Sequence, residues 1–232
     1  MLYVCISCLI RYEISGRRIK NGITFRSMVP LFIAKLSKRL DECLPGRAAQ
    51  EIMMIGPRRF KSKVDQKKVP AAVLILLYPF DNEWYFFLTK RTKTVEHHKG
   101  QISFPGGMVE KSESYKNAAL RETFEEIGVN MKEINIIGAL TPLYVPVSKF
   151  EIFPFIGWTA KKPETVMHDI EVDRIFSPSI KNLMLEETKK ERRDILSDSS
   201  IAVPYFDLDG EVVWGATSII LSEFKAILEE AL

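Results

Sequence analysis

Three glutamates stand close together near the middle of the chain, at Glu122, Glu125 and Glu126. If Tyr115 to Ile127 forms a helix, about 100° of rotation per residue puts the three carboxylates on one side, at spacings i, i+3 and i+4. Carboxylates placed in this way repel one another, and near a helix C-terminus the macrodipole disfavours them as well. A hard divalent cation removes that repulsion and prefers clustered carboxylate oxygens. The stretch therefore predicts a Mg²⁺ or Mn²⁺ site, with a plain solvated acidic face as the alternative.

The residues that flank this helix suit the same chemistry. Phe104-Pro105-Gly106-Gly107 comes just before it, and paired glycines permit backbone conformations that other residues resist. Such a loop can present a carbonyl to a metal or an amide to a phosphate. Arg121 adjoins Glu122, so we expect its guanidinium to pair with a carboxylate and hold it in place.

The other side of the helix predicts how it is held. With Leu120 set at 0°, Phe124 falls at about 40° and Ile127 at about 340°. These three residues form one apolar stripe. We expect the stripe to pack on the core and the carboxylates to face the opposite way.

Strands and helices are expected to alternate around this segment. The run Val69 to Tyr78 is short and rich in Val, Ile and Leu, which is typical of a buried strand. With the turn residues Pro79 to Asn82 and a second strand at Trp84 to Lys90, it predicts a hairpin. Further strands are expected at Ile134–Pro142, Phe150–Thr159 and Val212–Trp214, and helices at Pro30–Cys43, Lys181–Ile195 and Ser218–Leu232. Elements in this order predict an α/β sandwich.

Seven fixed positions in the segment resemble the signature of the Nudix hydrolases, G-x5-E-x7-R-E-U-x-E-E-x-G-U. The matching residues are Gly107, Glu113, Arg121, Glu122, Glu125, Glu126 and Gly128. Val129 fits the final aliphatic place, whereas Thr123 stands where an aliphatic residue is usual. The resemblance implies a Nudix-type α/β/α sandwich with a mixed β-sheet. It also implies metal-assisted hydrolysis of a diphosphate linked to another moiety.

Position by position, the resemblance implies four metal ligands: the Gly107 carbonyl and the carboxylates of Glu122, Glu125 and Glu126. A divalent ion would neutralise the diphosphate and lower the pKa of a bound water. The proton of that water goes either to one of these glutamates or to a carboxylate from another loop, for which Glu171 and Asp173 are candidates. The catalytic residues that we expect are Glu125, Glu126, Arg121 and Glu171.

A second resemblance concerns the substrate. Residues 87–107, FLTKRTKTVEHHKGQISFPGG, are similar to the extra motif of coenzyme A diphosphatases, which cleave coenzyme A to 3′,5′-ADP and 4′-phosphopantetheine. Shorter likenesses over residues 30–230 lie at Leu44-Pro45-Gly46, Ala49-Gln50, Thr141-Pro142 and Trp214-Gly215-Ala216-Thr217. The substrate-binding residues that we expect are Arg91, Lys90, His98, Gly106 and Phe104.

Some features of this motif leave the substrate open. Glu96 stands where an arginine is often found, and an arginine there would suit a phosphate of the nucleotide. For His98 two roles stay open, donation to a phosphate and a bond within its own loop. The substrate could also be another nucleoside diphosphate derivative, such as ADP-ribose, a dinucleotide or an oxidised nucleotide.

A function of another class is a non-catalytic nucleotide-binding regulatory module, because a fold does not fix a function. Such a module would commonly have lost one of the metal-binding glutamates, and this chain retains all three. We therefore expect an enzyme.

The N-terminal region differs from the rest in charge. Residues 1–70 are strongly basic and the remainder is acidic, although the whole chain carries only +3. We expect an extension at residues 1–27, either non-native or a transit peptide, then an N-terminal helix and basic loop at 28–68, and the hydrolase domain at 69–232. A role of the basic part in binding RNA or a membrane is disfavoured, because it has no recognisable RNA motif or aromatic platform.

Composition limits the remaining classes. The chain is 46% hydrophobic and 27% charged, as globular proteins are, and its three cysteines are too few for a disulfide framework. The longest apolar run, Val69 to Phe80, is shorter than the ~20 residues of a membrane-spanning helix. We expect a cytoplasmic protein, or an organellar one if residues 1–27 are a transit peptide. It should act as a monomer or homodimer on a small, coenzyme A-like nucleotide, with no nucleic acid or membrane partner.

Overall fold

The structure is a computed structural model that describes residues 29–55, 68–92, 100–168, 171–196 and 199–232. At its centre is a six-stranded sheet built around β1 (Val69–Phe80), the buried strand that the sequence predicts. β8 (Phe150–Trp158) runs parallel to β1, whereas the other pairs in this sheet are antiparallel. The sheet is therefore mixed, as expected. Its order is β2-β1-β8-β6, with β5 also on β1 and β7 also on β8; these strands are β2 (Glu83–Phe86), β5 (Gly106–Met108), β6 (Asn135–Ala139) and β7 (Leu143–Val145).

The predicted hairpin joins β1 to β2. Asp81 and Asn82 both have positive φ, 48° and 60°, as the favoured two-residue hairpin turn requires. Beyond β2 the chain leaves the main sheet and enters a second one of order β4-β3-β9, which contains β4 (Ile102–Ser103), β3 (Leu88–Arg91) and β9 (Val172–Phe176). A third sheet of order β10-β11-β12 contains β10 (Lys189–Leu196), β11 (Ser199–Leu208) and β12 (Glu211–Trp214).

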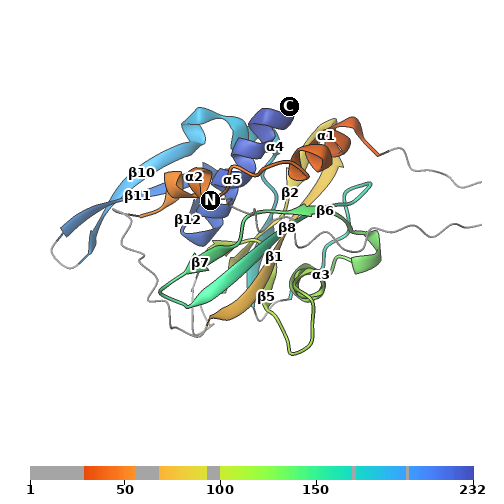
Figure 1. Cartoon of the computed structure of the whole chain (residues 1–232), viewed down its shortest axis with the longest axis horizontal. Coiled ribbons are helices and arrows are strands. Elements are labelled where there is room, and N and C mark those ends of the chain that lie inside the picture. Colours follow the sequence, from red (N-terminus) through yellow and green to blue (C-terminus); the bar gives the residue numbers. More distant parts are fainter. Residues whose placement is uncertain (1–28, 56–67, 93–99, 169–170, 197–198) are drawn as a thin grey trace, which may run out of the picture.

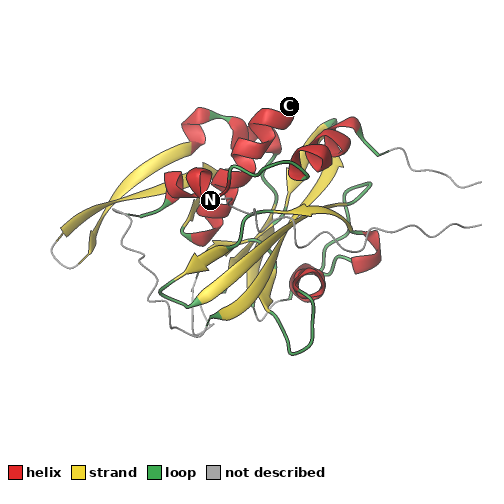
Figure 2. Ribbon diagram, viewed as in Figure 1, coloured by secondary structure: helices red, strands yellow, loops and turns green. Residues whose placement is uncertain are grey.

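Helices cover both faces of the central sheet, which gives the predicted α/β/α arrangement (Figure 1; Figure 2). On one face α3 (Tyr115–Ile127) packs over alternate residues of β1, and this core includes Leu74, Leu76 and Tyr78. On the other face α1 (Leu31–Leu40) and α5 (Ala216–Ala231) pack over Ile75 and Leu77. The shorter helices are α2 (Gly46–Gln50), α4 (Ile180–Met184) and three 3₁₀ turns at Glu51–Met53, Met131–Glu133 and Glu186–Thr188.

Local sequence fixes both ends of α3. The Ser114 hydroxyl accepts a hydrogen bond from the Asn117 N–H at 3.2 Å, which caps the N-terminus. Gly128 has φ 73° at the C-terminus, in the left-handed conformation that glycine adopts without a Cβ penalty. The helix thus spans the residues that the glutamate spacing predicts.

The predicted apolar stripe on α3 is wrong in part. Phe124 is 50% exposed, whereas Ile127 is buried and Leu120 is partly buried. Small residues make the contact instead: Ala118, Ala119 and Thr123 are buried, together with Glu126. Small side chains let the helix approach β1 and β5 closely. The face of α3 that packs on these strands includes Glu126, so one of the three carboxylates is buried.

The predicted helix at Lys181–Ile195 is wrong beyond its first turn, because α4 ends at Met184 and β10 begins at Lys189. Lys and Arg favour helices, but here they have cross-strand partners. Lys190 Nζ lies 2.6 Å from Asp207 Oδ2 of β11, and the Arg192 guanidinium lies 5.1 Å from the ring centre of Trp214 in β12. Such partners decide strand formation and come from elsewhere in the chain. β7, β9 and β11 were not predicted either.

Within the described ranges, no helix combines the length and the apolar character that a bilayer crossing demands.

Candidate active site

Glu122 lies directly over the backbone of Gly107. α3 packs against both β1 and β5, and β5 carries this glycine. A Cβ added at Gly107 would come within 2.5 to 2.6 Å of the Glu122 carboxyl group. Any larger residue would therefore displace that carboxylate. Burial raises the pKa of Glu122, and the guanidinium of Arg121 opposes this rise.

Arg121 organises the acids along the helix. Its Nη1 donates to Glu122 Oε1 and to Glu125 Oε2, both at 2.9 Å. Its Nε and Nη2 donate to the two carboxylate oxygens of Glu113 at 3.1 Å, and Nη2 also donates to the Met108 carbonyl at 3.0 Å. The planar guanidinium has donors for all four groups at once, which an ammonium does not. This bidentate bond lowers the pKa of Glu113.

Glu126 is the buried member of the set, with 4% of its surface exposed. Burial raises the pKa of Glu126 to about 8, although the neighbouring Arg91 and the Gly106 N–H favour its charged form. Glu126 Oε1 lies 3.6 Å from Arg91 Nη1, while Oε2 has no hydrogen-bond partner among the described residues. A buried, unpartnered carboxylate oxygen is costly, and such an exception calls for a functional explanation.

Arg91 and Glu171 approach the helix from the second sheet. Arg91 ends β3, and its Nη2 lies 3.8 Å from Glu171 Oε2, just ahead of β9. The Glu171 side chain is 48% exposed, and its charge helps to raise the pKa values of Glu122 and Glu126. The structure thus brings together eight of the predicted residues: Gly106, Gly107, Arg121, Glu122, Glu125, Glu126, Arg91 and Glu171.

Three of the predicted substrate-binding residues are placed differently. Phe104 is 2% exposed and packs near Phe86, so it is a core residue and that prediction is wrong. Lys90 points to the other side of its strand, where its Nζ lies 3.0 Å from Glu211 Oε2. His98 lies outside the described residues.

Gly106 is required for packing as well as for the site. A Cβ there would come within 2.4 Å of the Ala72 carbonyl oxygen on β1. This tight approach lets the Gly106 amide reach Glu126. Glu113, by contrast, was not among the predicted site residues, although it stands at a fixed position of the signature.

The donor set fits a divalent ion, although no three His, Cys, Asp or Glu side chains of the described ranges converge as a ready-made metal site. Guanidinium groups hold the acids instead, Arg121 at Glu122 and Glu125 and Arg91 at Glu126. The free Oε2 of Glu126 and the Glu122 carboxylate beside Gly107 are hard oxygen donors of the kind that Mg²⁺ and Mn²⁺ prefer. The assignment of metal ligands stays a prediction.

The shorter motifs that resemble coenzyme A diphosphatases lie on the opposite face of the sheet and serve packing. Gln50 Nε2 donates to the Thr141 carbonyl at 2.9 Å and to the buried Glu223 at 2.8 Å. The Thr217 hydroxyl donates to the Ile102 carbonyl, and the Ser222 hydroxyl to the Ala49 carbonyl, both at 2.8 Å. These bonds join α5 to α2 and to β4, and α2 to the segment that follows β6.

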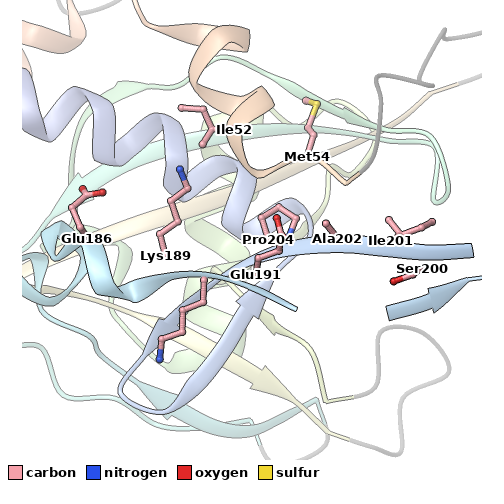
Figure 3. A pocket seen from close by; sticks show the side chains of 10 residues that line it. Ile52, Met54, Glu186, Lys189, Glu191, Ser200, Ile201, Ala202 and Pro204 are labelled. Atoms are coloured by element: carbon pink, nitrogen blue, oxygen red, sulfur yellow. The ribbon is translucent and has the colours of Figure 1, made fainter. Parts of the chain in front are cut away.

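A further cavity is not lined by the acids either. It has a volume of about 740 Å³ and lies between the segment Ile52–Met54 and the strands β10 and β11, with Lys189, Ile201 and Pro204 on its wall (Figure 3). Its lining contains none of the glutamates of α3.

Relatives with curated names match most of this chain. "Nudix hydrolase 3" of Caenorhabditis elegans is 29% identical over 68% of this chain and 72% of its own length. The worm's "Peroxisomal coenzyme A diphosphatase ndx-8" is 27% identical over 77% of this chain and 76% of its own length. "Nudix hydrolase 22, chloroplastic" of Arabidopsis thaliana is 29% identical over 72% of this chain, which spans only 56% of that protein.

A solved structure titled as a C. elegans Ap4A hydrolase binary complex is similar at 16% identity and a TM-score of 0.47, over 70% of this chain and 98% of that one. That likeness is too slight to define the fold, which the strand order above establishes. The family model described as NUDIX domain matches residues 68–198, which is more than half of the chain. The protein belongs to the Nudix family.

Proposed function

We propose that the protein is a metal-dependent hydrolase that cleaves the diphosphate of coenzyme A, or of its derivatives, to 3′,5′-ADP and 4′-phosphopantetheine. The observation that carries the proposal is the buried Glu126, whose Oε2 has no hydrogen-bond partner within the described ranges, near Glu122 and the Gly106-Gly107 backbone of β5. Nudix hydrolases act on diphosphate bonds and need a divalent metal ion. The buried Glu126 and the partly buried Glu122 supply the oxygens that could hold one.

The metal-binding residues in this proposal are Glu122, Glu125 and Glu126, with the Gly107 backbone beside them. Mg²⁺ or Mn²⁺ would neutralise the diphosphate and lower the pKa of a bound water. Arg121 positions two of the three carboxylates through its fork of hydrogen bonds, with Glu113 anchoring the guanidinium. Because Glu126 has a pKa of about 8, it must lose a proton before its oxygens can hold a cation near neutral pH.

Two carboxylates are placed to take the proton of the attacking water. Glu171 is half-exposed and beside Arg91, and Glu125 is also half-exposed on the helix. We favour Glu171, because it comes from a different element and can approach the water from outside the group of metal ligands. The guanidinium of Arg91, near Glu126 and Glu171, can meet the charge of the diphosphate.

The choice of coenzyme A is supported by the motif at residues 87–107, which supplies Arg91 and Gly106 to the site, and by the likeness to the worm coenzyme A diphosphatase. Relatives are named for the chloroplast, mitochondrion and peroxisome. The cytoplasmic location therefore stays a prediction, as does the choice between monomer and homodimer.

The test is a product assay on a panel of diphosphates. The full chain is incubated with Mg²⁺ or Mn²⁺ and with coenzyme A, dephospho-coenzyme A, ADP-ribose or a dinucleoside polyphosphate, and the products are separated by chromatography. We expect the highest kcat/KM for coenzyme A, with 3′,5′-ADP as a product. Cleavage of ADP-ribose or the dinucleotide without cleavage of coenzyme A would reject the substrate. No cleavage of any compound would favour the regulatory module.

A further inference from the structure

A second, smaller cavity lies on the same face of the central sheet as α3. Its volume is about 350 Å³, which is within the range of small-molecule sites. The side chains of alternate residues on β1 and β2 form its aromatic floor, and β9 with the loop after β8 forms its walls. The lining residues that the following argument uses are Tyr78, Phe80, Tyr85, Lys162, Thr165 and Ser177.

The floor of this cavity is a set of packed rings. The rings of Tyr78 and Phe87 are stacked with centres 4.7 Å apart, and those of Tyr78 and Tyr85 with centres 5.7 Å apart. Phe80 meets Tyr85 edge-on at 6.1 Å, yet it is 52% exposed. Phe80 thus packs against Tyr85 and still keeps half of its surface exposed, which leaves aromatic surface that a planar ligand ring can stack on.

Polar groups stand around the rings. Lys162 Nζ lies 4.9 Å from the centre of the Phe80 ring, a cation–π distance. Thr165 and Ser177 bring hydroxyls to the wall of the cavity. A few polar groups around an aromatic surface are typical of sites that orient a heteroaromatic ligand. The positive charge of Lys162 also suits an anionic substituent on that ligand.

The cavity and the acid site lie toward opposite ends of the paired strands β3 and β9. Leu88 pairs with Phe176 at the cavity end of these strands, and Arg91 pairs with Val172 at the acid end. Three to four residues at about 3.3 Å each separate the two ends, so the distance is about 10 to 13 Å. Ile175 of β9 lines the cavity and pairs with Thr89, which stands two residues before Arg91 and so on the same face of β3.

The loop after β8 also joins the two places. It carries Lys162 and Thr165 at the cavity, and then follows the C-terminal end of α3. The Val166 N–H donates to the Ile127 carbonyl at 2.9 Å, and the His168 N–H donates to the Glu126 carbonyl at 3.2 Å. The same loop therefore lines the cavity and is hydrogen-bonded to the backbone of the buried Glu126.

We propose that this aromatic cavity binds the nucleobase of the diphosphate substrate, and that Lys162 contacts a phosphate carried by the ribose of that nucleoside. The inference rests on the proposed function, because the diphosphate must lie at the acids while the base lies at Phe80. Coenzyme A has such a base and such a phosphate at one end. The flexible pantetheine arm lacks a ring to stack, and it leaves the site on the other side of the diphosphate.

The test is calorimetric binding of the two halves of coenzyme A to the full chain with Mg²⁺ present. We expect Phe80→Ala to weaken binding of 3′,5′-ADP about tenfold, at the lower end of the range for loss of one stacked base. Binding of 4′-phosphopantetheine should not change. Phe124→Ala is the matched control, because Phe124 is 50% exposed on α3 and lies outside the cavity. Phe80→Tyr keeps a ring and should restore binding.

Lys162 gives a second, independent measurement. Lys162→Ala should weaken 3′,5′-ADP more than 5′-AMP, and the exposed Lys132→Ala should weaken neither. The proposal is overturned if the wild type binds no 3′,5′-ADP, if Phe80→Ala binds it as the wild type does, or if Phe80→Ala loses 4′-phosphopantetheine instead. A melting temperature within a few degrees of wild type shows that each variant is folded.

The failure of this inference differs from that of the proposed function. Unchanged 3′,5′-ADP binding by Phe80→Ala in an enzyme that cleaves coenzyme A rejects the cavity and leaves the function standing. Binding of 3′,5′-ADP that depends on Phe80, in a protein that cleaves no diphosphate, supports the cavity and rejects the function.

Discussion

The two faces of the central sheet each bury a glutamate, and the two carboxylates have opposite surroundings. Glu223 on α5 is fully buried, and its oxygens accept from Gln50 Nε2 at 2.8 Å and from the Thr141 N–H at 3.3 Å. Glu126 on α3 is also buried, but Oε2 has no hydrogen-bond partner in the described part of the chain. A satisfied buried group specifies packing, whereas an unsatisfied one carries a free-energy cost, and a catalytic or metal-binding role accounts for such a cost.

Residues on the α5 face stabilise the fold, whereas residues on the α3 face form the proposed active site. The α5 face holds two side chains of the shorter coenzyme A-diphosphatase motifs, Gln50 and Thr217, which donate to backbone carbonyls and, for Gln50, also to Glu223. The α3 face holds acids paired with two arginines. We expect substitutions on the first face to change stability and those on the second to change rate.

The largest difference is expected when the same substitution, Glu to Gln, is made at both positions. Glu126→Gln should lower kcat at least ~100-fold, as loss of a key electrostatic group does. Glu223→Gln should keep kcat within a few-fold but lower the free energy of unfolding by about 1–3 kcal/mol, since its amide NH2, a donor, would face one of the two buried donors that Glu223 now accepts from. Steady-state kinetics and urea unfolding measure both. Equal rates in the two variants would reject the assignment.

The pH dependence of stability distinguishes the two glutamates as well. The pKa of Glu126 is about 8 in the folded protein and near 4.3 in an unfolded chain. The folded state therefore holds one more proton between these values. The contribution of protonated Glu126 to the free energy of unfolding is complete below about pH 4. It falls by about 1.4 kcal/mol per pH unit up to about pH 8.

Urea unfolding in a chelator from pH 5 to 8 measures this slope. Glu126→Gln should remove that part of the slope and be more stable than wild type at pH 8. The matched Glu223→Gln variant should keep it. A wild-type curve that does not decline over this range would contradict the burial of an unpaired Glu126.

Arg121 should be irreplaceable by another cation. Arg121→Lys keeps the charge but loses the fork that holds Glu113, Glu122 and Glu125. We expect kcat to fall roughly tenfold, the lower end for groups that orient metal ligands, with little change in KM. The control is Arg47→Lys, whose ion pair with Glu51 lies on an exposed surface. A KM effect alone would mean that Arg121 contacts the substrate instead.

The smallest effect is expected on the scaffold face. Thr217→Val removes the hydroxyl that donates to the Ile102 carbonyl and keeps the shape of the side chain. It should cost about 1 kcal/mol of stability and leave kcat/KM unchanged. A rate loss larger than the loss of folded protein would show that the α5 face reaches the chemistry.

The sequence predicts the parts of the molecule that local pattern determines. β1, its hairpin turn, α3 and α5 are found close to their expected places, because apolar runs, turn residues and caps act over a few positions. The expectation of a helix at β10 is wrong because this segment becomes a strand by pairing with β11, which lies outside its own sequence. Charged residues alone do not reveal such partners.

The site shows the same division. Fixed spacing was enough to name the acids of α3 and Arg121. It did not show that Glu126 is inward, because burial depends on how closely small residues let α3 approach β5. It also did not separate Arg91, which faces the acids, from its neighbour Lys90, which pairs with Glu211 across the strand. The two residues are consecutive on β3, so their side chains point to opposite faces of the strand.

The most direct test of the central claim is a Mn²⁺ titration followed by electron paramagnetic resonance at pH 8, with wild type, Glu126→Gln and Glu223→Gln side by side. If the acids of α3 are the metal site, wild type and Glu223→Gln remove free Mn²⁺ from the spectrum, while Glu126→Gln does so at least tenfold more weakly. Equal capture by all three proteins, or none by the wild type even with nucleotide present, would contradict the account.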